Sequence, residues 1–369
     1  MTATTDAQDQ AVGARRLDAP TRFARHRGLV ILVIAVLATL LFGATLYALR
    51  SSSSTEVLSS TDCLERENTA VISGQRDEQY KISNPGTGQT VDARNARFVS
   101  YPFETLYPLS LGNDGPGRHL CLIGGLVQGQ QPRDLTWQQM KSDYDGTGAR
   151  VAGNDWYVVD GLRVENVEDG VDPRGTEGRY PKDGDGFLLR NLYFQYIRDD
   201  CIENDDIAGG VIEDSLFDGC NTGISERPSD GNPQLRHPAP SDEELVLRNV
   251  LMRLEPMPGP RGEDDANVLG HGQLFKWSDV SNRLRIEDSI FLVEQVPNRG
   301  TTDFPEGTVA KNVTVVWLGG GAFPGRVPEG VRITTDLQVW ETAKDRWLSR
   351  HGCVSFTRCD RLIDPSGAP

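Results

Sequence analysis

Five carboxylates lie within eight residues at the centre of the chain: Asp199, Asp200, Glu203, Asp205 and Asp206. Acids this close together can do three kinds of chemistry. They can chelate Ca²⁺, which takes about six to eight oxygen ligands. They can supply the acid and base of glycoside hydrolysis, or they can accept hydrogen bonds from sugar hydroxyls. The structural alternative is that they satisfy backbone groups at tight turns.

Three groups of candidate site residues follow from this stretch and its surroundings. The candidate catalytic residues are Asp185, Asp199, Asp200 and His271. The candidate substrate-binding residues are Arg198, Glu203, Asp205 and Arg227. A Ca²⁺ site, if the acids serve one, would use Asp199, Asp200 and Glu203; the sequence requires no other cofactor. His271 lies between two glycines, where it is either an acid/base group or a surface histidine.

The acids lie between two copies of a short repeat. The segments 189–194 (LRNLYF) and 212–217 (IEDSLF) share an apolar residue, a charge and an Asn or Asp, and Asn191 and Asp214 are 23 residues apart. The pattern returns at 247–252 and 286–291, and more loosely at 310–315. A second short segment follows the first copies, opened by a small residue, as in Gly170-Val171, Cys201-Ile202 and Gly223-Ile224.

These units predict an all-β fold, a right-handed parallel β-helix of roughly eight to ten coils. Strands this short cannot bury their apolar residues alone, so the units must stack about 4.8 Å apart. A β-sandwich is the alternative, but no Asn-Gly or Asp-Gly turn links two apolar runs of equal register. The residues expected to face inward are Leu189, Leu192, Ile202, Ile212, Leu216, Ile224, Leu247, Val250, Ile286 and Ile290.

The N-terminal part predicts a membrane anchor. Residues 28–49 carry no charge, and at about 1.5 Å per residue a helix of this length crosses the hydrocarbon layer. Five arginines precede the segment and only Arg50 follows closely, so the positive-inside rule places residues 1–27 in the cytoplasm. We therefore expect a single-pass protein of the cell membrane whose main domain is extracytoplasmic. A cleaved signal peptide is the alternative, although its apolar run is shorter.

Charge and cysteines limit the class of partner and the compartment. The net charge of −15 disfavours nucleic acid, because phosphate binding needs clustered Lys and Arg. All six cysteines lie on the side expected to be exported, where disulfides form. Cys353–Cys359 and Cys201–Cys220 are plausible pairs by their spacing, although a free inward thiol at Cys201 is an open alternative.

The expected organisation has five parts, of which the cytoplasmic tail (1–27) and the membrane segment (28–49) come first. A Ser-rich linker covers residues 50–62, the β-helix residues 63–334, and a C-terminal helix and tail residues 335–369. Thr335-Asp336 offers a helix N-cap and Gly352 a stop. The helix either covers the open end of the solenoid or braces its side.

Three segments resemble the catalytic set of polygalacturonases: Asp185-Gly186-Phe187, Asp199-Asp200-Cys201 and Gly270-His271-Gly272. Over residues 70–330 the repeats resemble the right-handed parallel β-helix superfamily, which includes pectate lyases, polygalacturonases and bacterial exported proteins of no settled activity. The last group is the closer likeness. The chain departs from the polygalacturonases because 71 residues separate Asp200 from His271, and because their Arg-Ile-Lys segment is missing.

Two functional hypotheses remain open. The first is a polysaccharide hydrolase or lyase of the cell surface, with Asp199 and Asp200 as acid and base beside Asp185. The second is a non-catalytic, glycan-binding scaffold of the cell envelope. In both, the partner is a polysaccharide, and the acidic net charge favours a neutral or weakly charged one.

Overall fold

The computed structural model describes residues 60–101, 106–112, 117–153, 156–174, 186–228 and 243–363. Asp185 and the segment 28–49 lie outside these residues. In the described part, no helix is long and apolar enough to cross a membrane. The chain is all-β, with a 20-stranded sheet of parallel pairs and few helices.

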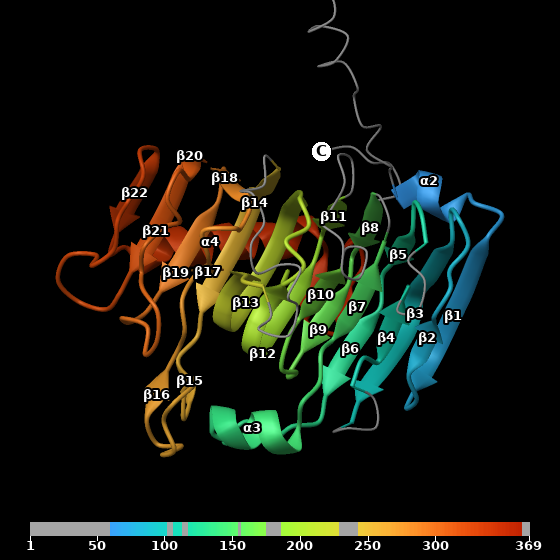
Figure 1. The fold of residues 1–369 in the computed structure, drawn as a ribbon, viewed down its shortest axis with the longest axis horizontal. Helices are drawn as coiled ribbons and strands as arrows, with labels where there is room; N and C mark the ends of the chain where they lie inside the picture. The colour runs from blue at the N-terminus through green and yellow to red at the C-terminus, as the bar shows by residue number, and fades with distance from the viewer. Residues whose placement is uncertain are drawn as a thin grey trace, which may run out of the picture. The chain divides into compact units, whose positions relative to one another are not determined.

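The strands stack in three columns, which we call A, B and C (Figure 1). Column A contains the first parts of β1 (Thr69–Arg76) and β3 (Thr90–Ser100), then β5 (Cys121–Ile123), β8 (Tyr157–Asp160), β11 (Phe187–Arg190), the first parts of β13 (Gly210–Glu226) and β14 (Glu244–Leu254), β18 (Arg283–Glu287) and β20 (Val309–Lys311). Column B contains the second parts of β1, β3 and β14, the first part of β12 (Tyr193–Glu203), the middle of β13, and β6 (Leu126–Gly129), β9 (Arg163–Glu165), β19 (Ile290–Val293), β21 (Val313–Trp317) and β22 (Val331–Thr334).

Column C is the shortest of the three. It contains β2 (Tyr80–Ile82), β4 (Leu109–Leu111), β7 (Ala149–Ala152), β10 (Val171–Arg174), the ends of β12 and β13, and β17 (Phe275–Trp277). From β5 to β13 the chain visits A, B and C in turn and returns to A one strand further along. This stacking is consistent with a β-helix solenoid.

The repeat in the sequence marks the turn from column A to column B. Asn191, Asp214, Asn249, Asp288 and Asn312 all have φ between 44° and 54°, a left-handed conformation that Asn and Asp tolerate better than other side chains. The turns are joined from strand to strand, because the Asn249 amide donates to Asp214 at 2.9 Å and the Asn312 amide to Asp288 at 2.7 Å. Asn or Asp therefore recurs at this position of each repeat because the turn requires a residue that tolerates the left-handed conformation.

Because of this turn, two of the residues that were expected to face inward do not. Leu189, Leu192, Ile202, Ile212, Ile224, Leu247, Val250 and Ile286 belong to the central core, as expected. Leu216 and Ile290 instead face outward, where they pack with Trp340 and Trp347 of the C-terminal helix. The left-handed residue shifts the alternation of side chains by one position, so Phe217 and Phe291 take the inward places.

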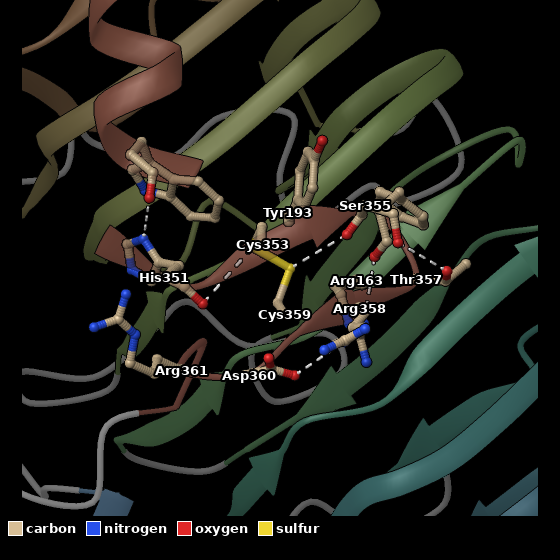
Figure 2. Close-up of a disulfide and its surroundings, with 12 residues drawn as sticks. Arg163, Tyr193, His351, Cys353, Ser355, Thr357, Arg358, Cys359, Asp360 and Arg361 are labelled. Carbon is tan, nitrogen blue, oxygen red and sulfur yellow. Dashed lines mark hydrogen bonds and ion pairs between the residues drawn. A yellow bond between two sulfur atoms is a disulfide. The ribbon is translucent and has the colours of Figure 1, made fainter. Parts of the chain in front are cut away.

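The predicted C-terminal helix is α4 (Leu337–Arg350), with Asp336 as its N-cap. It braces the outer side of column B and packs on Tyr193 and Leu216. Figure 2 shows the Cys353–Cys359 disulfide beside Tyr193, within the hairpin of β23 (Cys353–Ser355) and β24 (Arg358–Cys359) that follows the helix.

Two of the three disulfides are the expected pairs, Cys201–Cys220 and Cys353–Cys359. The third, Cys63–Cys121, ties α2 (Ser60–Leu64) to column A. Two further elements stand away from the columns (Figure 1): α3 (Trp137–Asp143), and the antiparallel pair of β15 (Met257–Pro258) and β16 (Leu269–Gly270).

Candidate functional site

The outer side of column C carries charged side chains in register. Asp172, on β10, follows Val171, which pairs with Ile202, so Asp172 and Glu203 occupy neighbouring positions. Glu203 is next to Ser225, and Ser225 is next to Lys276 of β17. A second row, three residues earlier, places Asp169 near Asp200, whose backbone N–H donates to the Asp169 carboxylate at 3.0 Å. Like charges therefore stand on adjacent strands, which is unfavourable in a sheet.

Glycines precede the inward apolar residue at two places in this column, Gly170 and Gly223, because the strands approach closely there. A Cβ atom on Gly170 would lie 2.4 Å from the carbonyl oxygen of Cys201. Beneath the site, the Cys201–Cys220 disulfide links β12 to β13. The acids are thus fixed to a rigid part of the sheet.

The centre of the site is a group of three buried carboxylates, from Glu168, Asp169 and Asp199, with oxygen atoms within 4.8 Å of one another. Burial, with the charges of Asp199 and Asp200, raises the pKa of Asp169 well above its usual range. Burial and Asp200 raise the pKa of Asp199 to about 6. Acids that lie this close cannot all ionise, so they hold at least one proton near neutral pH.

Two lysines border this group. Lys141, on α3, pairs with Glu168. Lys276 pairs with Asp200 at 2.6 Å. Burial alone would lower the pKa of Lys276, but Asp200, Asp199 and Asp205 raise it overall. The second carboxylate oxygen of Asp200, Oδ1, is buried and has no hydrogen-bond partner.

Glu203 and Asp205 extend the acidic region. Burial and the charges of Asp169, Asp172, Asp205 and Asp200 raise the pKa of Glu203 well above its usual range. Burial raises the pKa of Asp205 to about 6, although that carboxylate accepts a hydrogen bond from the Ser225 hydroxyl at 2.9 Å. Glu203 therefore stays protonated above the usual pH range of a glutamate, and Asp205 ionises only near pH 6.

A pocket of about 150 Å³ opens beside Asp199. Asn221 and Thr222 of β13 and Lys276 of β17 line one side, and the segment around Arg261 and His271, which flanks the β15–β16 pair, lines another. The chain can pass this close only with a glycine, since a Cβ on Gly272 would lie 2.4 Å from the Thr222 hydroxyl oxygen.

His271 is fully buried against this pocket. Its Nδ1 atom lies 2.7 Å from the Gly272 carbonyl oxygen, which can only accept, so Nδ1 carries the proton. Burial lowers the pKa of His271, which keeps the ring neutral. Nε2 is also buried and has no hydrogen-bond partner of good geometry, although the Gln295 backbone lies near the ring.

Arg198 lies apart from the pocket. It is buried and donates to the carbonyl oxygens of Leu135, at 2.8 Å, and Pro258, at 3.0 Å. These bonds hold the segment that precedes α3 and the β15–β16 pair in place. Arg227 is exposed and lines the pocket.

Of the sequence-based candidates, three line the pocket, Asp199, His271 and Arg227, and three lie in the adjoining acidic region, Asp200, Glu203 and Asp205. Sequence reasoning missed Glu168, Asp169, Lys141 and Lys276. Asp169 had a signal, because it precedes Gly170-Val171 as Asp200 precedes Cys201-Ile202. The sequence carried no such signal for Lys276, because 76 residues separate it from Asp200.

The carboxylates within metal-ligand range of one another are not those expected for Ca²⁺. Of the expected set, only Asp199 belongs to the group formed with Glu168 and Asp169. Lys141 already pairs with Glu168, and Asp169 accepts a hydrogen bond from the Asp200 backbone at 3.0 Å. The residues fit a metal poorly, since protein groups already supply the countercharge and donors that Ca²⁺ would bring.

Comparison with protein-family models, with curated proteins and with solved structures found no match for this chain.

Proposed function

We propose that this protein binds and hydrolyses a polysaccharide of the cell surface, using the pocket on column C. In this proposal the fold is a right-handed parallel β-helix of the pectate lyase-like type. Residues 28–49 anchor it in the membrane with the main domain outside the cell. The observation that carries the proposal is Asp199, a buried acid with a pKa of about 6 in a pocket lined by hydrogen-bonding groups.

Asp199 has the properties of a general acid. A carboxyl group with a raised pKa is still protonated near the pH at which the enzyme works, so it can give its proton to the departing glycosidic oxygen. Asp169, within 4.8 Å, favours this protonated form by its charge whenever it is ionised. The bond from the sugar carbon to that oxygen then breaks.

Asp200 is the complementary base. Its pairing with Lys276 provides a nearby positive charge, and its Oδ1 atom has no other partner. Asp200 does not line the pocket itself, but its partner Lys276 does, and in this proposal a water molecule beside Lys276 gives its proton to Oδ1 while its oxygen bonds to the sugar carbon. The proton given by Asp199 and the proton taken by Asp200 balance the addition of one water molecule.

The remaining groups of the pocket suit the hydroxyls of a sugar. The side chains of Asn221 and Asn298 line the pocket and can both donate and accept hydrogen bonds. Such mixed donors and acceptors fix the orientation of a polyol.

The test is release of reducing ends from a panel of cell-surface and plant polysaccharides by the full-length protein. Asp199→Asn should lower the rate on the cleaved substrate by about 10²- to 10⁴-fold. Asp218→Asn is the matched control, because Asp218 is similarly buried but lies on column B, paired with Lys344. Equal rates for wild type and Asp199→Asn would rule out Asp199 as the acid.

A non-catalytic scaffold is the second candidate, and the two lysine pairs favour it. Glu168 and Asp200 each hold a lysine countercharge, which stabilises a binding surface without any reaction. In the same panel, saturable binding of a glycan without any release of reducing ends would favour this function over hydrolysis.

A further inference from the structure

Three arginines gather at the pocket: Arg227, Arg261 and Arg299. They come from three separate segments, namely the end of β13, the loop after β15 and the loop after β19. All three side chains are exposed. Arg261 also lies over the Trp137 ring, with its guanidinium carbon 4.7 Å from the ring centre, which fixes its position. We call this group the arginine rim.

The arginine rim outnumbers the one carboxylate among the residues that line the pocket, Asp199, whose pKa burial raises although the charge of Arg261 acts to lower it. Among the described residues, none of the three arginines forms a salt bridge, although the chain carries a net charge of −15. Arginines elsewhere, such as Arg150 and Arg190, are paired with aspartates. Three guanidinium groups that converge around a single acid are suited to bind an external anion, since each offers a fork of N–H donors.

Further along column C the arginines are already paired with acids. On β7 and β10, Arg150 is paired with Asp172, and Arg174 is paired with Asp172 and Asp206. These paired arginines are poorly placed to bind the further charges of a polyanion. A ligand with one charge can place it at the rim and lay neutral sugars along these strands.

We infer that the pocket binds a glycan that carries a single anionic substituent at the sugar held by the arginine rim, with neutral sugars on either side. This inference rests on the proposed glycan-binding function, and it sharpens the expectation of a neutral or weakly charged ligand. The substituent is a carboxylate or a sulfate ester, both of which accept paired N–H donors. The rim residues determine specificity and take no part in the bond-breaking step.

The experiment is calorimetric titration of the full-length Asp199→Asn protein, which avoids turnover, with four oligosaccharides of equal length. One is neutral, one carries a single internal uronate, one carries a single internal sulfated sugar, and one is an oligouronate. We expect one of the singly charged ligands to bind about tenfold or more tightly than the neutral one. The better of the two identifies the substituent. The oligouronate should bind no better than the neutral ligand.

Substitutions locate the effect. In the same background, Arg261→Gln and Arg299→Gln should each remove most of the preference for the singly charged ligand and leave neutral binding unchanged. Arg346→Gln is the matched control, because Arg346 is an exposed arginine on α4, which packs against column B and not against the pocket. It should change neither affinity.

Two results would overturn the inference while the proposed function stands: neutral and singly charged ligands binding alike, or the oligouronate binding most tightly. Unchanged preference in both arginine variants would also overturn it. If no glycan binds and none is cleaved, the proposed function itself fails.

Discussion

Two rows of charged side chains run along this sheet, one on column A and one on column C, and they follow opposite rules. On column A the register joins Asp160, Arg190, Glu213, Arg248, Glu287 and Lys311, so the sign alternates at every strand. On column C, Asp172 stands beside Glu203, and Asp169 beside Asp200. The charges of the first row neutralise one another. The acids of the second row repel one another, and bound protons, lysines or a ligand must offset that repulsion.

The difference teaches where to look for function in a repetitive fold. Alternating charges on stacked strands contribute modest stability, whereas stacked like charges cost stability. The outer side of column B is apolar and covered by α4. Column C is thus the side on which the sequence gives up stability, and it is also the side with the pocket.

The largest expected effect is on column A. Asp160 is fully buried, and its carboxylate accepts from Arg190 at 2.9 Å and from the Asn191 amide at 2.7 Å. Asp160→Ala should lower the free energy of unfolding by roughly 3 kcal/mol, because it removes the buried carboxylate to which both Arg190 and Asn191 donate. Urea unfolding measures this. A loss below about 0.5 kcal/mol would show that the alternating row is not stabilising.

A smaller effect of opposite sign is expected on column C. Glu203 resists ionisation in the folded protein but ionises when the chain unfolds, so wild type loses stability as the pH rises above the usual Glu range. Glu203→Gln should therefore stabilise the protein by about 1 kcal/mol at pH 8 and by almost nothing at pH 4. Destabilisation at pH 8 would mean that Glu203 is ionised and compensated.

The smallest effect is expected for an exposed member of the column A row. Arg248 contacts Glu213 at 3.2 Å and Glu287 at 3.4 Å, but its side chain is 50% exposed. Arg248→Gln should cost less than about 1 kcal/mol and should weaken in high salt, as surface ion pairs do. Thermal unfolding at two ionic strengths measures both. A loss as large as that of Asp160→Ala would make the whole row one cooperative network.

Local pattern was enough to predict the stacked strands, α4 and two disulfides, because repeat spacing and helix caps are set by neighbouring residues. It failed at Leu216 and Ile290, since the left-handed Asp214 and Asp288 shift the alternation in a way that composition does not reveal. In the site, Asp199 and Asp200 could be named as candidates from the sequence because they are adjacent. Lys141 and Lys276 were not, because only the stacking brings them to the acids.

The most direct test of the central claim is the pH dependence of unfolding for wild type and Asp199→Asn. The folded-state pKa of Asp199, about 6, lies above its usual value, so wild type should lose stability from about pH 4 to pH 6, and the variant should lose less. We predict that the difference in unfolding free energy shifts in favour of Asp199→Asn by up to about 3 kcal/mol between pH 4 and pH 8. A difference that is independent of pH, or that shifts towards wild type, would contradict the claim that column C holds its acids at a cost in stability.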